Sequence, residues 1–335
     1  MEKSKKIVLS GIQPSGTPTL GNYVGMLRNC AKLQTEETYC YYFVANMHAT
    51  TVRQDPEELM RRSVEVLALL LACGVDPERS ALFIQSHVKE HAELAWALSC
   101  NTYIGELNRM TQFKEKSTKH ADNINAGLFT YPVLMAADVL LYQTNLVPVG
   151  KDQKQHLELA RNIAIRFNNA YGETFTVPEP FISSVGGRVM SLQDPLKKMS
   201  KSDANPNAYV SMMDDPSVIV KKIKRAVTDS ENRIAYEPEK PGVSNLLSIY
   251  STFTGKTTEE AVQTFSGMGY GHLKTAVADA VVAELTPVQE KYRRFAADKA
   301  HLNAIMLDGA LKARNAAKKT MDAVYSRIGY LPPTL

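Results

Sequence analysis

Phosphate binding is the first chemistry that the residue types of this chain indicate. The stretch from Lys198 to Ser202 places the ammonium groups of Lys198 and Lys201 beside the hydroxyls of Ser200 and Ser202, around Met199. Ammonium groups, hydroxyls and backbone N–H groups are the donors with which loops hold polyphosphates. The stretch therefore predicts a phosphate-binding loop, although a solvated basic surface loop would have the same composition.

A second candidate anion site lies near the N-terminus. Apolar residues from Ile7 to Leu9 predict a buried strand, the Gly-, Pro- and Ser-rich stretch from Gln13 to Asn22 predicts a tight loop, and Tyr23 to Leu33 has helical spacing. A loop between a strand and a helix N-terminus presents N–H groups to an anion, and Gly21 allows close approach of a ligand. The loop lacks the Gly-Lys-Ser/Thr of a P-loop, and its glycines are too widely spaced for a dinucleotide-binding fingerprint.

The elements around these loops alternate between strands and helices. Further strands are expected at 39–45, 81–85 and 146–149, with a helix after about residue 152 and one from Pro56 that is capped by Asp55 and ends at Gly74. This order predicts an α/β fold with a doubly wound, parallel, Rossmann-like sheet. Ligands bind such sheets beyond the carboxyl ends of the strands, so we expect the loops at 13–22 and 150–153 to meet in one crevice.

The rest of the chain is expected to be helical. Residues from about 105 to 138 interrupt the alternation, and after residue 204 the pattern is helical only, with helix starts expected at Pro216 and Pro287. We therefore predict a catalytic domain at 1–203 with a helical insertion at about 105–138, and an all-helical domain at 204–335 whose last helix packs back on the first domain. Basic clusters at 221–225 and 291–294 are compatible with contacts to an RNA backbone, or with solvated helix faces.

The amino-acid composition indicates the cellular compartment of the protein but not its activity. The chain has 335 residues, 44% hydrophobic and 22% charged, with a net charge of +4 that does not by itself indicate nucleic-acid binding. Its four cysteines lack any Cys-x-x-Cys pairing, which favours free thiols in a reducing cytoplasm and no metal site. The most apolar segment, 64–75, is too short to span a bilayer. We expect a cytoplasmic protein with neither a membrane nor DNA as a partner.

The two loops resemble the paired His-Ile-Gly-His and Lys-Met-Ser-Lys-Ser signatures of class I aminoacyl-tRNA synthetases, with Thr19 and Asn22 in place of the two histidines. Further blocks resemble the bacterial tryptophanyl-tRNA synthetase family, in which that replacement is common; they are 105–107, 113–117, 131–138, 148–156 and 222–229. The resemblance covers nearly the whole chain. It implies a homodimeric ligase that activates L-tryptophan with ATP and Mg²⁺, releases pyrophosphate, and transfers tryptophan from the adenylate to the 3′ end of tRNA(Trp). It also implies that the helical domain reads the anticodon and that the insertion contributes to the dimer interface.

The resemblance assigns the phosphate chemistry to particular residues. Attack of a carboxylate on the α-phosphorus of ATP brings two anions together, so cationic and N–H donors are needed around the phosphates. The catalytic residues implied are Lys198, Lys201, Lys116 and Gln13. The ATP-binding residues implied are Gln13, Pro14, Ser15, Gly21, Asn22, Gly150, Lys151, Asp152, Val189, Lys198, Met199, Ser200, Lys201 and Ser202.

The amino acid pocket is expected around a carboxylate. The indole N–H is a donor only, so a buried acceptor selects it over phenylalanine. The resemblance implies that Asp138 is this acceptor, and that Met135, Gln153, Tyr131 and His48 complete the tryptophan pocket. A carboxylate in the apolar stretch 134–141 would be costly to bury without partners.

Departures from the family pattern and other motifs leave alternatives open. Lys151 and Asn46 stand where many relatives have acidic residues, which keeps open a catalytically weak paralogue that binds RNA or senses tryptophan. A tyrosine-specific enzyme would share the fold, but its pocket would need a second polar partner for the phenol. The stretch from His87 to His91 matches the His-x-x-Glu-His pattern of zinc peptidases, but we expect His87 in a turn, apart from the helix that carries His91.

Overall fold

A five-stranded parallel sheet forms the centre of the first half of the chain. The computed structural model describes residues 5–113, 124–150, 153–181 and 188–331. The strands are β1 (Lys6–Ile12), β2 (Thr38–Val44), β3 (Ser80–Ile84), β4 (Leu146–Pro148) and β5 (Glu179–Phe181), in the order β3-β2-β1-β4-β5. The order reverses between β1 and β4, which pair through Val8 and Leu146. The predicted doubly wound sheet and four of its strands are confirmed.

Strand β5 was not predicted, and its sequence explains why. It has only three residues, Glu179 to Phe181, none of them fully buried, and the middle one is Pro180. Proline within a short stretch argues against a strand unless the strand lies at a sheet edge, which is where β5 lies.

Helices cover both faces of the sheet, because alternate side chains of each strand point to opposite faces. Tyr42 and Leu82 pack in a core with α4 (Pro56–Ala72), whereas Phe43 and Phe83 pack in a second core with α5 (Glu90–Ser99), α8 (Ala126–Leu141) and α9 (Lys154–Tyr171). Helix α4 begins and ends as predicted: the Asp55 carboxylate accepts from the N–H of Glu58 at 2.9 Å, and Gly74 has a φ of +93°. The short elements α3 (Asn46–Ala49), η3 (Gln85–His87) and α6 (Ile104–Asn108) connect these layers.

The helix after the first loop is less regular than its apolar spacing suggests. It consists of α1 (Leu20–Asn22), a π-helical segment η1 (Tyr23–Leu27), α2 (Arg28–Cys30) and a 3₁₀ turn η2 (Ala31–Leu33). Its core residues continue directly into those of the second half of the chain, so the two halves share one hydrophobic cluster.

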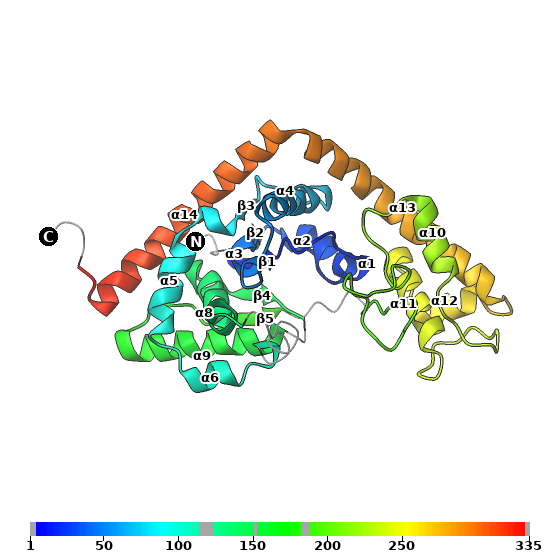
Figure 1. Cartoon of the computed structure of the whole chain (residues 1–335), viewed down its shortest axis with the longest axis horizontal. Helices are drawn as coiled ribbons and strands as arrows, with labels where there is room; N and C mark the ends of the chain where they lie inside the picture. The colour runs from blue at the N-terminus through cyan, green and yellow to red at the C-terminus, as the bar shows by residue number, and fades with distance from the viewer. Residues whose placement is uncertain (1–4, 114–123, 151–152, 182–187, 332–335) are drawn as a thin grey trace.

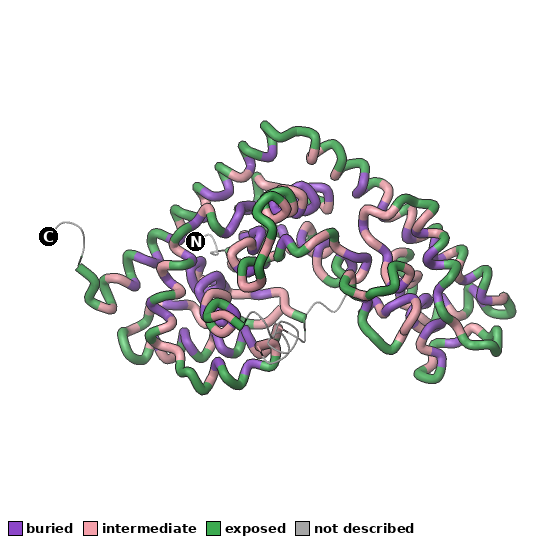
Figure 2. The backbone as a smooth tube through the Cα atoms, viewed as in Figure 1, coloured by how far each residue is buried: buried purple, intermediate pink, exposed green. Residues whose placement is uncertain are grey.

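Regular structure in the described part of the second half consists of helices. They are α10 (Pro216–Lys224), α11 (Pro241–Thr254), α12 (Thr258–Thr264), α13 (Tyr270–Ala297) and α14 (Lys299–Ile328). Helices α13 and α14 form an arch across the molecule, with mostly exposed outer faces and buried inner ones (Figures 1 and 2). The helix start predicted at Pro287 is wrong, because α13 continues through it. Pro287 has no N–H to donate to the carbonyl of Ala283, four residues earlier in the helix. Both residues are exposed, so water can donate to that carbonyl instead, while Leu285 and Val288 stay buried.

Helix α14 returns to the sheet and packs along β3 (Figure 1). A Cβ on Gly309 would lie 2.0 Å from the carbonyl oxygen of Leu82, so the helix touches the strand backbone directly. Lys312 Nζ donates to the carbonyl of Pro77 at 2.9 Å, and Arg314 Nε donates to the carbonyl of His87 at 2.7 Å. None of the helices in the described ranges combines the length and the hydropathy needed to cross a membrane.

Candidate active site

The topology brings two of the predicted loops to one place. Gln13 follows the carboxyl end of β1, and Gly150 follows that of the neighbouring strand β4. Gln13, Ser15 and Gly150 are exposed there, at the point where the strand order reverses, which is where doubly wound sheets bind ligands. Three other predicted residues, Lys116, Lys151 and Asp152, lie outside the described residues.

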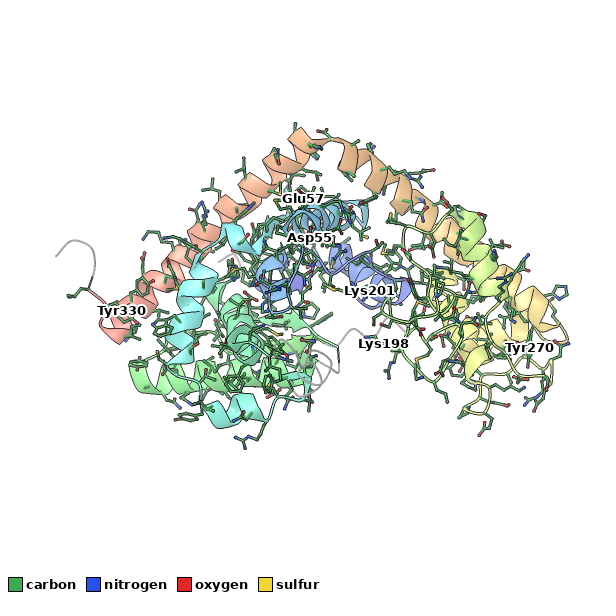
Figure 3. The ribbon with its side chains drawn as sticks, in the orientation of Figure 1. Asp55, Glu57, Lys198, Lys201, Tyr270 and Tyr330 are labelled. Carbon is green, nitrogen blue, oxygen red and sulfur yellow. The ribbon has the colours of Figure 1, made fainter. Side chains whose placement is uncertain are left out.

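The loop at 198–202 reaches the first loop from the other half of the chain. Lys201 Nζ donates to Ser15 Oγ at 2.8 Å and lies 3.4 Å from the carbonyl oxygen of Gly16. Figure 3 shows Lys201 beside the helix that follows the first loop, with Lys198 nearby. Burial lowers the pKa of the Lys201 ammonium from its ordinary value, and the charge of Arg62 lowers it further. A poorly solvated ammonium of this kind gains strongly from an incoming anion.

Met199 anchors this loop to the first one. Its side chain is buried, and its N–H donates to the carbonyl of Val189 at 3.1 Å. A Cβ on Gly21 would lie 3.6 Å from Met199 Cβ and 3.7 Å from Val189 Cβ, in van der Waals contact with both. Lys198 pairs through its backbone with Met190, and the Ser200 and Ser202 hydroxyls lie 2.9 Å apart. The interleaved methionine therefore fixes the loop while the exposed Lys198 and Ser200 face solvent.

The two residues in the histidine positions of the signature cap the helix. Thr19 N–H donates to Asn22 Oδ1 at 2.9 Å, and Asn22 N–H donates to Thr19 Oγ1 at 3.4 Å. Because these side chains bond each other, they position the loop. The backbone of this loop also pairs with the second half, where Leu20 N–H donates to the carbonyl of Val210 at 2.8 Å.

Asp138 lies in a separate, buried polar cluster. Its side chain is 2% exposed. Oδ2 lies 2.6 Å from His48 Nε2, and Oδ1 lies 2.6 Å from His91 Nδ1 and 2.7 Å from Gln85 Nε2, which donates to it. Burial alone would raise the pKa of Asp138, but the imidazoles of His48 and His91 outweigh that effect and lower the pKa below its ordinary value. The carboxylate is thus ionised and can only accept hydrogen bonds.

The other residues predicted for the amino acid pocket lie near this cluster to different degrees. The Tyr131 hydroxyl lies 2.8 Å from His156 Nε2, and its ring makes an edge contact with His48 at 6.4 Å between centroids. Met135, one turn before Asp138 on α8, is half-buried, as is Gln153. A cavity of about 370 Å³ opens beside α8, and Tyr131 is the one residue of the predicted set that lines it.

Sequence reasoning missed Gln85 and His91 as partners of Asp138. His91 lies inside the stretch that matches the zinc-peptidase pattern, so a signal existed but pointed to another chemistry. The geometry does not fit that chemistry: His91 uses both ring nitrogens, on Asp138 and on the Tyr142 hydroxyl, and His87 lies in the separate turn η3 as expected. Within the described ranges, no three His, Cys, Asp or Glu side chains gather as metal ligands would.

The Rossmann-like sheet, with a lysine-bearing loop bonded to the loop at its switch point, is the arrangement that the resemblance to class I aminoacyl-tRNA synthetases predicts. The family model described as class I tRNA synthetases (W and Y) matches residues 1–286. The chain belongs to this family.

Individual relatives agree with this assignment. The chain is 55% identical over 332 residues to the tryptophan–tRNA ligase of Clostridium perfringens (strain 13 / Type A), covering 99% of this chain and 100% of the relative. Among solved structures, tryptophanyl-tRNA synthetase from Mycoplasma pneumoniae superimposes with a TM-score of 0.88 at 36% identity, covering 98% of each chain. The Campylobacter jejuni enzyme, complexed with ADP and tryptophan, gives 0.81 at 38% identity, covering 96% of this chain and 99% of that one.

Proposed function

We propose that this chain is a tryptophan–tRNA ligase in which the loops at 13–22 and 198–202 together hold ATP and Asp138 selects the amino acid. The contact that carries this proposal is the bond between Lys201 Nζ and Ser15 Oγ at 2.8 Å, because it unites the two loops at the switch point of the sheet. The relatives named above indicate the amino acid, since all three are tryptophan enzymes that match nearly the whole chain.

In the first step, a carboxylate oxygen of tryptophan attacks the α-phosphorus of ATP. An oxygen–phosphorus bond forms, and the bond from that phosphorus to the bridging oxygen of pyrophosphate breaks. Lys201 and Lys198 compensate the charge that moves onto the pyrophosphate, and Gln13 with the N–H groups near Gly21 donates from the other side. Lys116, Lys151 and Asp152 keep the roles that the resemblance implies, as predictions.

Mg²⁺ would travel with the phosphates of ATP. The groups at the two loops are mainly ammonium, hydroxyl, amide and N–H groups, which suit phosphate oxygens better than a metal ion that prefers carboxylate ligands. Mg²⁺ commonly keeps several waters and takes ligands from substrate phosphates, so this donor set fits a nucleotide-borne ion.

Tryptophan recognition depends on the ionised state of Asp138. An acceptor-only carboxylate matches the donor-only indole N–H, whereas phenylalanine would leave the buried acceptor unpaired. Tyr131 and Met135 lie on the same side of α8, at spacings of seven and three residues from Asp138, and would contact the ring. His48 bonds Asp138 at 2.6 Å, and Gln153 is the N-cap residue of the neighbouring helix α9, where it would face the substrate ammonium.

The second step transfers tryptophan to a terminal ribose hydroxyl of tRNA(Trp) and requires mainly positioning. We assign anticodon contact to the helical region at 204–335, which carries basic residues in the last turn of α10 at Lys221, Lys222 and Lys224. Lys222 is held by Asp214 at 2.7 Å, so Lys221 and Lys224, both exposed, are the better candidates for RNA phosphates. With ATP and tRNA as substrates, and free thiols at its cysteines, the chain would work in the cytoplasm.

The homodimer implied by the resemblance has a candidate surface on α6 and α9, beside the start of the predicted insertion. Tyr103 and Ile104 are 63% and 69% exposed, and Ile165 lines a cavity of about 520 Å³ between α6 and α9. Arg166 covers the Tyr103 ring at 4.2 Å and pairs with Glu106 at 2.7 Å, which rigidifies the patch. Exposed apolar groups beside an ordered ion pair are suited to a partner surface.

Exchange of labelled pyrophosphate into ATP tests the proposal. Wild-type protein should support exchange with tryptophan, and not with tyrosine or phenylalanine at equal concentration. Exchange with tyrosine alone would contradict the proposed amino acid, and no exchange with any of the three would favour a paralogue that binds without catalysis.

A further inference from the structure

A buried hydrogen-bond chain lies behind Asp138 and has no role in the mechanism described so far. The Tyr142 hydroxyl lies 2.8 Å from His91 Nε2, and His91 Nδ1 lies 2.6 Å from Asp138 Oδ1. Gln85 adds a second donor to the same Oδ1 at 2.7 Å. His91 and Gln85 are fully buried and Tyr142 is 4% exposed, so water does not compete for these bonds.

The positions of the protons in this series of hydrogen bonds follow from the residues at its two ends, Asp138 and Tyr142. The ionised carboxylate of Asp138 can only accept, so the ring nitrogen that faces Oδ1, His91 Nδ1, carries a proton. Nε2 of the neutral imidazole is then an acceptor, and the Tyr142 hydroxyl, which keeps its proton because burial raises its pKa well above the ordinary value, donates to it. Tyr142 therefore stabilises the tautomer in which His91 donates to the carboxylate.

The aromatic surroundings hold the His91 ring in this orientation. Its centroid lies 5.7 Å from that of Phe43, 6.1 Å from that of Phe83 and 5.5 Å from that of Tyr142. These rings leave His91 little freedom to flip, and they keep the bonds in a low-dielectric setting where they are strong.

The two oxygens of Asp138 are consequently unequal. Oδ1 accepts from both His91 and Gln85, whereas within the described part of the chain Oδ2 contacts His48 only. A carboxylate oxygen has about two acceptor directions, so Oδ1 is saturated and Oδ2 keeps one. Gln85 also accepts from Met47 N–H at 3.1 Å, which ties the helix that carries His48 to the same cluster.

We propose that Tyr142, His91 and Gln85 are specificity-determining positioning residues, which saturate Asp138 Oδ1 and reserve the remaining acceptor direction of Oδ2 for the indole N–H. This inference rests on the proposed function and deepens it. Without these hydrogen bonds to Oδ1, the carboxylate of Asp138 could rotate about its Cβ–Cγ bond, and Oδ2 would no longer be fixed toward the indole. Tryptophan binding and its discrimination from phenylalanine would then fall, while ATP binding, at a different set of residues, would not.

Tyr142→Phe tests the inference with the least disturbance, because it deletes one hydroxyl. Tyr41→Phe is its matched control: Tyr41 stacks on Tyr142 at 4.4 Å between centroids, is similarly buried, and does not contact His91. In pyrophosphate exchange, Tyr142→Phe should raise the KM for tryptophan about tenfold, the cost of one charge-coupled hydrogen bond. The KM for ATP and the kcat should stay within about twofold, and Tyr41→Phe should resemble wild type in all three constants.

A pair of His91 substitutions separates positioning from packing. His91→Asn retains an N–H donor near the Nδ1 position and should keep the KM for tryptophan within a few-fold of wild type, whereas His91→Leu fills the space without a donor and should raise it by about 10- to 100-fold. The ratio of kcat/KM for tryptophan to that for phenylalanine should fall in parallel. If His91→Leu does not fold, the two tyrosine variants still decide the question.

Two results would overturn the inference. One is a Tyr142→Phe variant whose tryptophan KM and selectivity match those of Tyr41→Phe. The other is an equal loss in the constants for tryptophan and ATP, which would indicate a general structural defect. If the variants behave in this way while wild type activates tryptophan, the inference alone fails. If wild type activates tyrosine in place of tryptophan, the proposed function fails, and the reservation of Oδ2 for an indole fails with it.

Discussion

Lys201→Met is the change that most directly tests the joined loops. Methionine keeps the unbranched, apolar stem that packs at this half-buried position and removes only the ammonium group. The folded protein loses one bond to Ser15 at 2.8 Å and one longer contact to the Gly16 carbonyl at 3.4 Å. The loop should stay in place, because Met199 and its backbone bond to Val189 remain.

The size of the expected loss in rate follows from the environment of the Lys201 ammonium group. A hydrogen bond to a charged group contributes about 1.5–3 kcal/mol, which corresponds to about 10- to 150-fold in rate if it is made in the transition state. Removal of a preorganised donor aimed at developing charge costs about 10²- to 10³-fold. We therefore expect the kcat of tryptophan-dependent pyrophosphate exchange to fall about 100-fold, with the KM for tryptophan little changed.

Lys197→Met is the matched control, since it removes the same charge nearby. Lys197 is 77% exposed and pairs with Asp194 at 2.8 Å, away from Ser15. Exchange measured at saturating tryptophan over a range of ATP concentrations should leave this variant within about twofold of wild type. A Lys201→Met variant within threefold of wild type, or equal losses in both variants, would refute the assignment of Lys201 to the phosphates.

Three further predictions concern stability. Gly309→Ala would force a Cβ to within 2.0 Å of the Leu82 carbonyl and should lower the free energy of unfolding by about 1–3 kcal/mol, measured in urea, whereas Gly271→Ala, with open space around its Cβ, should not lower it. Burial would raise the pKa of Asp229, but the Tyr270 hydroxyl and the Lys240 ammonium outweigh it and lower the pKa to about 2. A carboxyl whose pKa is lower in the folded state stabilises the fold above about pH 4 and loses that contribution as the pH falls toward 2. The difference in unfolding free energy between wild type and Asp229→Asn, about 1 kcal/mol once solvent screening of this exposed carboxyl is included, should accordingly shrink from pH 5 to pH 3, and a constant difference would contradict the assignment. Thr19→Val, which keeps the shape but removes the cap, should cost about 1 kcal/mol by thermal or chemical unfolding, and an unchanged midpoint would show that the cap between Thr19 and Asn22 is not stabilising.

Local signals predicted the elements that depend on local chemistry. Asp55, Pro56 and Gly74 predicted both ends of α4, because caps and positive φ angles are properties of single residues. The same reasoning was wrong at Pro287, where the packing of Leu285 and Val288 maintains the helix through a residue that usually begins one. Local pattern therefore predicted helix ends well where tertiary packing did not override it.

The candidate active site likewise has residues that the sequence predicted and residues that it did not. The lysine loop and the strand–loop–helix near the N-terminus were visible as motifs, and the resemblance singled out Asp138. The partners of Asp138 were not visible, since Gln85 follows β3 and His91 lies on α5, about 50 residues away along the chain. A hydrogen bond between residues so far apart leaves no periodicity or spacing in the sequence, and only the fold reveals it.

The return of α14 to β3 has a consequence for synthesis of the chain. Strand β3 is at the edge of the sheet, and the helix that lies against its backbone is made roughly 200 residues later. At translation rates of about 5–20 residues per second, β3 remains uncovered for on the order of 10 to 40 s before α14 is synthesised. During that interval an apolar edge strand is open to pairing with another nascent chain, so a chaperone that shields strands at the ribosome would raise the yield of folded protein.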